Sequence, residues 1–419
     1  MSAAEPTGDD AILVIGGGLV GLCTALALQA RGAAVRVVDR GQPQRAASFG
    51  NAGVLGAWSC VPQALPGMWR DLPRWLLHPD SPVALRWRYL PRALPWLLRF
   101  LAAGREAGLS DRARAMLALN APVLDLYRRL LQGTGQEHLI RDCAYIHMYR
   151  EAHQLDLDSP GWRLRRELGA PFRVLSGAEL REVEPDVAPG YQAAVMAEGQ
   201  GVCLNPGRLV EALTERFRTQ GGRLIAAEVL ALRPQGGRGV LLDTTTGQLV
   251  ARRVVLAAGA WSARLLGPLG CHLPLEAERG YHRVFRNPGV NLGNIVTDVA
   301  LSAAASSMEM GLRVAGTAEF AGLDAPPSAR RSRMLDGLAV RMFPHLNTTQ
   351  VSEWMAPRPS FPDSLPVIGT VPGHGDITLA FGHAHLGLTG APMTGELAAD
   401  LTLGRTPNLD LAPYDPGRF

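Results

Sequence analysis

The feature that most constrains this chain is a glycine-rich turn that joins a short apolar run to a helix-like segment near the N-terminus. Residues 11–15 (AILVI) predict a buried strand. Gly16, Gly18 and Gly21 follow it as GxGxxG, and residues 19–30 continue with an apolar helical pattern. Glycines at this spacing allow a tight turn, close backbone approach to a pyrophosphate, and close packing of the helix on the strand.

A second strand with a carboxylate at its end completes the pattern. Residues 33–39 (AAVRVVD) predict this strand, and Asp39 ends it 18 residues after Gly21. A carboxylate in this place accepts hydrogen bonds from the ribose hydroxyls of an adenosine without a 2′-phosphate. Glycines that serve only a turn are the alternative. Strand, turn, helix, strand and acid in this order favour a dinucleotide site, although the motif alone does not separate NAD from FAD.

A second unit of the same kind is predicted in the middle of the chain. Residues 208–219 have a helical pattern, and 223–232 (RLIAAEVLAL) and 252–262 (RRVVLAAGAWS) predict two strands. The turn around 236–247 lies between these two strands. It indicates a hairpin that is inserted beside a parallel sheet.

Composition excludes some kinds of chemistry. All 42 basic residues are arginine, so no mechanism that needs a Schiff-base or general-base lysine is available. The 38 acidic residues are interleaved with the arginines, and no basic block indicates a nucleic-acid partner. The five cysteines are far apart and odd in number, and we find no signal peptide and no spanning apolar run. We therefore expect a cytoplasmic protein.

The segment between Trp58 and Trp96 is rich in aromatic and basic residues. It holds five of the eight tryptophans, mixed with arginines. Such residues on one amphipathic surface favour a lipid headgroup interface, which here would be the inner face of the membrane. Ordinary helices that pack Trp and Leu inward and Arg outward have the same composition. The sequence therefore leaves a peripheral membrane contact open.

Six groups of motifs occur in order over nearly the whole chain. They are VIGGGLVGLCTALAL (14–28), SFGNAG (48–53), VVLAAGAWS (254–262), ERGYH (278–282), GLRVAGTAEFAG (311–322), and EWMAPRPSFPDSLPVIG (353–369) followed by AFGHAHLGLTGAP (380–392). With these motifs the chain resembles the D-amino acid oxidase superfamily of flavoproteins. Within it, the chain is similar to the D-amino acid dehydrogenase and D-hydroxyproline dehydrogenase branch.

The resemblance implies an α/β fold and a cofactor. We expect a Rossmann-like FAD-binding domain with a parallel sheet, interleaved with an α+β substrate domain that contains a mixed or antiparallel sheet. The FAD-binding domain is expected at 1–85, 200–265 and 355–419. The substrate domain is expected at 86–199 and 266–354. FAD should be held noncovalently, because no cysteine lies in the C-terminal flavin motifs.

Arg358 is the main catalytic candidate that the resemblance implies. In the superfamily the Trp and Arg of a WxGxRP motif lie over the flavin, and the arginine commonly pairs with the substrate carboxylate. Here the match is WMAPRP (354–359), in which Ala and Pro replace the commoner residues. A guanidinium matches a carboxylate through two hydrogen bonds and stays charged. A structural arginine that binds loop carbonyls is the alternative.

Tyr281 and His282 are further catalytic candidates from the expected substrate-domain sheet. Similar tyrosines in the family donate a hydrogen bond to the substrate carboxylate, but a buried tyrosine whose hydroxyl is satisfied internally is equally consistent with the sequence. His383 and His385 lie one residue apart, yet no third ligand appears nearby, so we expect no metal. We interpret His383 as a packing or hydrogen-bonding residue of the flavin pocket.

Contacts to FAD are expected from the glycine turn, the acid and its neighbour, the loop after the second strand, the second unit, and the turn before the last helix. The loop at 48–53 suits backbone and hydroxyl contacts to a diphosphate or flavin, and a surface loop is the alternative. The expected residues are Gly16, Gly18, Leu19, Val20, Gly21, Asp39, Arg40, Ser48, Asn51, Ala52, Gly53, Val229, Ala258, Gly259, Trp261, Gly382, His385, Leu386, Gly387, Leu388 and Thr389.

The reaction implied is oxidation of the C–N bond of a D-amino acid, with D-proline or hydroxy-D-proline among the candidates. A hydride would pass from the α-carbon to flavin, and the electrons would then go to a quinone or another carrier. Oxygen is the alternative acceptor, as in glycine and sarcosine oxidases. In sarcosine-oxidase relatives a lysine near the flavin promotes the oxygen reaction, and its absence favours a dehydrogenase. A flavin-carrying subunit of an amine-oxidising complex is a further alternative.

Overall fold

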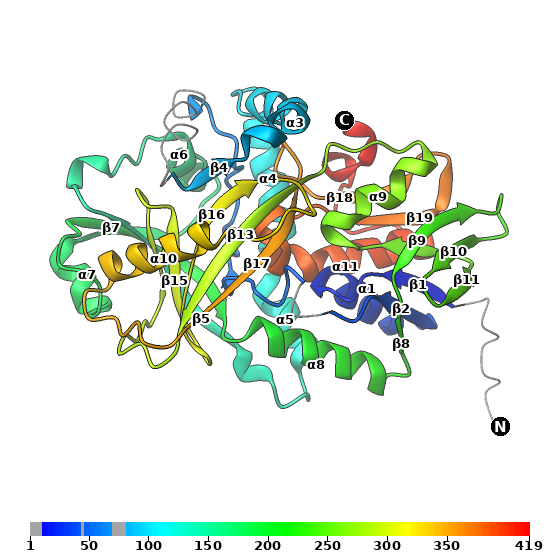
Figure 1. Ribbon diagram of the computed structural model, residues 1–419, viewed down its shortest axis with the longest axis horizontal. Coiled ribbons are helices and arrows are strands. Elements are labelled where there is room, and N and C mark those ends of the chain that lie inside the picture. The colour runs from blue at the N-terminus through cyan, green and yellow to red at the C-terminus, as the bar shows by residue number, and fades with distance from the viewer. Residues whose placement is uncertain (1–10, 43–45, 69–80) are drawn as a thin grey trace.

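The computed structural model describes residues 11–42, 46–68 and 81–419 and confirms the expected α/β fold, in which two main sheets lie side by side (Figure 1). The predicted βαβ unit is found where the sequence places it. Its elements are β1 (Ile12–Ile15), α1 (Leu19–Ala30) and β2 (Val35–Asp39). The helix begins directly after the glycine turn, so its N-terminal amides face the end of β1.

The first sheet has six strands in the order β18-β19-β12-β1-β2-β8, and all neighbours are parallel except β18 and β19. Three distant parts of the sequence build it, and Figure 1 shows their blue, green and orange ribbons together on one side of the molecule. Its remaining strands are β8 (Arg223–Ala226), β12 (Val254–Leu256), β18 (Val367–Val371) and β19 (His374–Phe381).

Two predicted strands of the middle unit are shorter than expected. The strand predicted over 223–232 is broken, because Ala227 N–H donates to Asp39 O at 2.9 Å in the first sheet whereas Glu228 N–H donates to the Thr245 side chain. The chain then enters a three-stranded antiparallel sheet of β9 (Val229–Pro234), β10 (Val240–Thr244) and β11 (Gly247–Ala251). The strand predicted over 252–262 ends at Leu256, and α9 (Ser262–Leu266) takes up its last residue.

The second main sheet has ten strands and is mixed, as expected. Its order is β17-β13-β16-β15-β14-β5-β7-β3, with β4 paired to β16 and β6 paired to β7. Most pairs are antiparallel, and β14–β5 and β16–β4 are parallel. Its strands are β3 (Val54–Leu55), β4 (Val83–Leu85), β5 (Ile140–Tyr149), β6 (Phe172–Ser176), β7 (Ala193–Cys203), β13 (Glu276–Phe285), β14 (Ile295–Asp298), β15 (Ala303–Met308), β16 (Gly311–Phe320) and β17 (Val351–Ser360).

The strands of the two main sheets can be compared with the predicted domain boundaries. All strands of the six-stranded sheet fall inside the ranges predicted for FAD binding. Strands β3 and β4 fall inside 1–85, however, and pair with the ten-stranded sheet. The chain therefore crosses between the two sheets before residue 86. The division into two domains itself stays a prediction.

Helices cover the sheets and complete two large apolar cores. One core joins β1 and β2 to α1, α5, α8 and α11, and the other lies between α10 and the ten-stranded sheet. Helix α11 runs along α1 (Figure 1). The helices are α3 (Leu90–Ala103), α4 (Leu109–Asn120), α5 (Val123–Leu131), α6 (Pro160–Glu167), α7 (Gly177–Val183), α8 (Pro206–Thr219), α10 (Ala329–Met342) and α11 (Gly387–Leu403).

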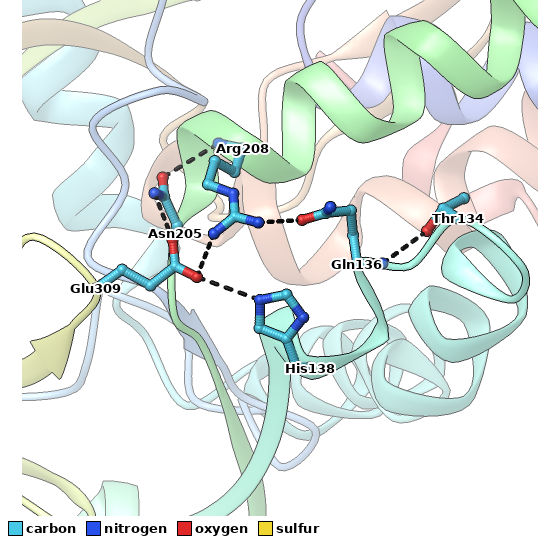
Figure 2. A network of polar contacts seen from close by, with 6 residues as sticks. All are labelled: Thr134, Gln136, His138, Asn205, Arg208 and Glu309. Atoms are coloured by element: carbon cyan, nitrogen blue, oxygen red, sulfur yellow. Dashed lines mark hydrogen bonds and ion pairs between the residues drawn. The ribbon is translucent and has the colours of Figure 1, made fainter.

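A polar network ties the start of α8 to the ten-stranded sheet (Figure 2). The Asn205 side chain accepts from Arg208 N–H at 3.1 Å and so caps the helix, while its amide donates to Glu309 at 2.9 Å. Glu309 also binds Arg208 Nη1 at 2.6 Å and contacts His138 at 3.3 Å. Arg208 donates in turn to Gln136. The network fixes the helix that supports the first sheet.

Residues 69–80 of the tryptophan-rich segment, with Trp69 and Trp75, lie outside the described part of the chain. Trp96 is buried and donates to Ser360 O at 3.1 Å. Trp87, Leu94 and Leu98 are exposed at and near α3. Among the described residues, no helix has both the length and the apolar content needed to cross a bilayer.

Candidate active site

A cavity of about 930 Å³ lies where the two main sheets meet. Its lining includes residues at or just after the carboxyl ends of four parallel strands, namely β1, β2, β12 and β19. Ligands of open α/β sheets bind at this edge. The opposite lining comes from the ten-stranded sheet, so one chamber joins the predicted cofactor motifs to the predicted substrate residues.

Most of the predicted residues line this cavity. All three catalytic candidates do so, as do eighteen of the cofactor candidates, which are Gly16, Gly18, Leu19, Val20, Asp39, Arg40, Ser48, Asn51, Ala52, Val229, Ala258, Gly259, Trp261, Gly382, His385, Leu386, Gly387 and Leu388. Gly21, Gly53 and Thr389 are not among the residues that line it. Thr389 donates to Val54 O at 3.1 Å and accepts from Gly56 N–H at 3.3 Å, so it holds the start of α11 against β3.

The glycine turn and Asp39 form one end of the cavity. Gly16 has φ of +110°, and a Cβ there would lie 2.4 Å from Ala257 O, so only glycine fits. Asp39 accepts from Gly17 N–H at 2.8 Å, and Leu19 N–H donates to Ser48 Oγ at 3.0 Å. Gly18, Leu19 and Val20 at the start of α1 line the cavity, where the positive end of the helix dipole favours an anion.

Arg40 and Trp261 close the same end of the cavity. The guanidinium carbon of Arg40 lies 3.8 Å from the centroid of a Trp261 ring. Both residues line the cavity beside Asp39. A cation stacked on an indole is a stable, flat surface of the kind that packs on an aromatic base.

The loop at 48–53 is held by side chains of the ten-stranded sheet. His282 Nδ1–H donates to Gly50 O at 2.8 Å, and Arg313 donates to Asn51 O. The His282 ring stacks on Trp354 with ring centroids 4.9 Å apart. A Cβ on Gly50 would lie 2.2 Å from Trp354, so this loop position requires glycine. Burial lowers the pKa of His282 to about 3 and keeps it neutral.

Arg358 forms an ion pair that the sequence did not predict. It lies directly opposite Glu278 across β17 and β13, and its Nη1 donates to Glu278 Oε1 at 2.7 Å. The guanidinium lies flat over Gly280, where a Cβ would be 2.3 Å from it. Glu278 is buried and also accepts from Ser360 Oγ at 3.0 Å. Burial raises the pKa of Glu278, but the charge of Arg358 and the hydrogen bonds outweigh it and lower the pKa overall.

The Tyr281 hydroxyl is satisfied inside the protein. It donates to Glu319 Oε2 at 2.5 Å and accepts from Ser328 N–H at 3.0 Å. Glu319 is itself buried and paired with Arg86 at 2.9 Å. A carboxylate that approached this hydroxyl would meet Glu319 at close range. The geometry therefore favours the internal hydrogen bond, the alternative that the sequence left open.

The two histidines of the turn before α11 have different surroundings. His383 is buried, its Nε2 lies 2.7 Å from Thr394 Oγ1, and burial lowers its pKa to about 3, which agrees with a packing and hydrogen-bonding role. His385 is exposed and lines the cavity. Desolvation within the cavity lowers its pKa, and the nearby Glu278 partly opposes this. Within the described residues, no cluster of three metal-binding side chains is found.

The cavity residues that the sequence analysis missed include a group on β5, β14 and α6. Tyr145 and His147 on β5, Thr297 on β14 and Arg165 on α6 line the end away from Asp39. The alternation in IRDCAYIHMY was the available signal, because residues 144, 146 and 148 are buried in the core and the side chains between them face the cavity. Arg165 follows the buried Trp162 by three positions on the same helix face.

These features fit FAD. The helix end and Asp39 suit the pyrophosphate and ribose, the flat Arg40–Trp261 pair suits the adenine, and the Trp354 side of the chamber suits a planar ring system. The volume lies near the top of the range for ligand pockets, about 300–1,000 Å³. Fold and cavity together define a flavoprotein of the dinucleotide-binding class with a separate substrate sheet.

Comparison with known proteins identifies the family. Residues 11–401 match the model of the FAD dependent oxidoreductase family, and the chain belongs to this family and uses FAD as its cofactor. It is 38% identical over 97% of its length to a "D-amino-acid oxidase" of Bradyrhizobium diazoefficiens, of which 98% is covered. It is 28% identical over 97% of its length to a "D-amino acid dehydrogenase" of the same organism, also covered to 98%.

A solved structure shows the same fold. The structure of glycine oxidase from Geobacillus kaustophilus matches with a TM-score of 0.77 and 24% identity, and the match covers 99% of this chain and all of that one. At this identity the likeness concerns the fold.

Proposed function

We propose that this protein oxidises the C–N bond of a D-amino acid, of the D-proline or hydroxy-D-proline type among others, and passes the electrons to a quinone or another carrier. When bound, FAD supplies the hydride acceptor for this oxidation. The main support is that one cavity joins the dinucleotide end at Asp39 to Arg358 on the substrate sheet. The names of the two Bradyrhizobium relatives support an amino acid as the substrate.

The chain's own residues would act mainly by positioning the substrate. Arg358 uses Nη1 for Glu278, and within the described part of the chain its Nε and Nη2 have no protein partner. These groups are the proposed contacts of the substrate carboxylate. Neutral His282 and Trp354 hold the loop at Gly50 in place and exclude water from this side of the chamber. Tyr281 fixes Glu319 and thereby the strand that carries His282.

Two kinds of observation bear on the electron acceptor. The absence of lysine favours a carrier, and the exposed Trp87, Leu94 and Leu98 with arginines nearby suit a contact with a membrane that contains quinone. The relative at 38% identity is named an oxidase, however, and this favours oxygen as the second candidate. A glycine- or sarcosine-type oxidase is therefore the competing function.

Flavin bleaching separates the candidate functions. Yellow protein is mixed without oxygen with D-alanine, D-proline, hydroxy-D-proline, sarcosine, glycine and the L-enantiomers, and its absorbance is followed. We expect D-amino acids to bleach it and the L-enantiomers to leave it yellow. A flavin-carrying subunit would not bleach with any of them, and this result would reject the proposal.

Reoxidation of the bleached protein then tests the acceptor. We expect a soluble quinone to restore the yellow colour much faster than air-saturated buffer. Rapid reoxidation in air with one hydrogen peroxide formed per flavin would instead identify an oxidase. Each experiment has a visible readout that does not depend on knowing the natural substrate.

A further inference from the structure

The end of the cavity away from Asp39 contains Arg165, which takes no part in the proposed cofactor or substrate contacts. Arg165 lies on α6, below the protein surface, and its accessible part faces the cavity. Its Nη1 donates to Gly161 O at 3.3 Å, and its guanidinium carbon lies 4.7 Å from the Trp162 ring centroid. No carboxylate of the described residues forms an ion pair with it.

The groups near Arg165 do not neutralise it. The ionisable groups that act on it are Cys60, Tyr145 and Tyr149. Burial raises the pKa of all three, so they are uncharged at neutral pH. Burial also lowers the pKa of His147, to about 3, and keeps it neutral. A buried cation without an acidic partner is costly, and this cost is typically offset by a ligand of opposite charge.

Arg165 shares its chamber with the predicted substrate residues. One row of directly opposed residues crosses the ten-stranded sheet, and every member lines the cavity. The row runs His147, Thr297, Ala304, Ala315, His282 and Trp354. Opposed residues point to the same face of a sheet, so the small residues in the middle form an open floor between its two ends. Arg165 lies at the His147 end, and Arg358 lies on the strand of Trp354.

The charges along this floor are unequal. Arg358 is already paired with Glu278, and together they contribute no net charge. Both histidines of the row are neutral. Among the described residues that line the substrate half of the cavity, Arg165 is therefore the cation whose charge is not compensated.

We propose that Arg165, together with His147 and Tyr145, forms an anion-binding subsite that binds a carboxylate of the substrate. This proposal rests on the proposed function, because it takes the ligand to be an amino acid. The carboxylate is either the side-chain carboxylate of an acidic amino acid, with the α-carboxylate on Arg358 as proposed above, or the α-carboxylate itself, which would then occupy Arg165 instead of Arg358. The two sources have the same chemistry and are separated by experiment.

The test compares Arg165→Met with Arg166→Met in the FAD-loaded protein. Arg166 is the next residue of α6 and forms an exposed ion pair with Asp158, so it controls for loss of an arginine from this helix. Anaerobic flavin reduction is measured with D-alanine, D-asparagine, D-glutamine, D-aspartate and D-glutamate. We expect Arg165→Met to lose about 10- to 100-fold in kcat/KM, mainly through KM, which is the range for hydrogen bonds to charged groups. Arg166→Met should behave as the wild type.

The substrate panel identifies the carboxylate. A loss with all five amino acids supports the α-carboxylate, and a loss with D-aspartate and D-glutamate alone supports the side-chain carboxylate. Arg165→Lys should recover part of either loss. Equal kinetics for the wild type and Arg165→Met, or loss of FAD from Arg165→Met, would overturn the proposal.

If no amino acid reduces the flavin, the proposed function is rejected, but the subsite can still be tested by ligand binding. Benzoate and succinate are titrated into the yellow protein, with benzamide as the uncharged control, and changes in the flavin spectrum and in Tm are recorded. We expect the carboxylates, and not benzamide, to bind the wild type and to bind Arg165→Met at least tenfold more weakly. Carboxylate binding that is equal in the two proteins would overturn the subsite.

Discussion

Replacement of Arg358 by methionine tests how much its ion pair with Glu278 contributes to the free energy of unfolding. The side chains of these residues are 25% and 6% exposed, and their atoms are 2.7 Å apart. Without the arginine, Glu278 keeps Ser360 Oγ at 3.0 Å and Gln63 Nε2 at 3.5 Å as donors. Removing one partner of a buried ion pair lowers the free energy of unfolding by about 3–5 kcal/mol. Because Arg358 is partly exposed and therefore partly screened by solvent, we expect a smaller loss, of about 2–4 kcal/mol.

The double variant Glu278→Gln/Arg358→Met removes both charges. We expect it to recover most of the loss in unfolding free energy, because neither charge then remains buried without a partner. Both variants should raise KM for a D-amino acid strongly while FAD stays bound, because Arg358 is the proposed carboxylate contact. Unchanged kinetics in Arg358→Met would reject that assignment, whatever happens to the stability.

The destabilisation caused by Arg358→Met should depend on pH in a direction that follows from the pKa of Glu278. In the wild type the pKa of Glu278 is lowered below 4.5, so the pair stabilises fully above that pH and loses its effect as the pH falls through the lowered pKa. In Arg358→Met the burial of Glu278 is no longer opposed by the arginine, and its pKa rises. The destabilisation should therefore be largest at pH 8 and shrink toward pH 5. Urea unfolding followed by tryptophan fluorescence measures it, and an equal deficit at both pH values would refute the reasoning.

Two further substitutions test the loop at Gly50 and the internal hydrogen bonds of Tyr281. Gly50→Ala places a Cβ 2.2 Å from Trp354, so we expect the His282–Trp354 stack to be displaced. The variant should bind FAD at least tenfold more weakly in a dialysis assay. FAD retention at the wild-type level would contradict the predicted clash. Tyr281→Phe removes one donor of buried Glu319, which keeps Arg86, and takes the acceptor from Ser328 N–H; we expect a loss of about 1–3 kcal/mol in urea unfolding with little change in KM. A large rise in KM at unchanged stability would instead support the direct carboxylate contact.

The parts of the fold that depend on local pattern were predicted well. Helix α1 occupies the predicted residues, because a strand, a glycine turn and an apolar helix are specified by neighbours in the sequence. The strand predicted over 223–232 was too long, because all its residues suit a strand and only the meeting of two different sheets breaks it at 227–228. Nothing in the local sequence shows which sheet a residue will join.

The candidate site shows the same difference between features set by local sequence and features set by long-range pairing. Cofactor contacts come largely from backbone turns, whose glycines and small residues are visible in short motifs. The Glu278–Arg358 pair joins residues 80 positions apart and depends on the register of β13 against β17, which the sequence does not show. Arg165 stands between half-exposed Arg163 and exposed Arg166, and since both Arg165 and Arg166 lie within one turn of buried Trp162, the sequence does not show which of them faces the cavity.

The buried histidines fix the charge of the cavity over the working range of pH. Burial lowers the pKa of both His147 and His282 to about 3, and the lowered pKa of Glu278 keeps that carboxylate ionised beside Arg358. Between pH 6 and 9 none of these groups changes its charge. The substrate amine must lose its extra proton before oxidation, so we expect the rate of flavin reduction at low substrate concentration to rise steadily with pH. Stopped-flow measurements over this range check it, and an inflection near pH 6.5 would mean that a histidine titrates and that the cavity is wetter than its burial indicates.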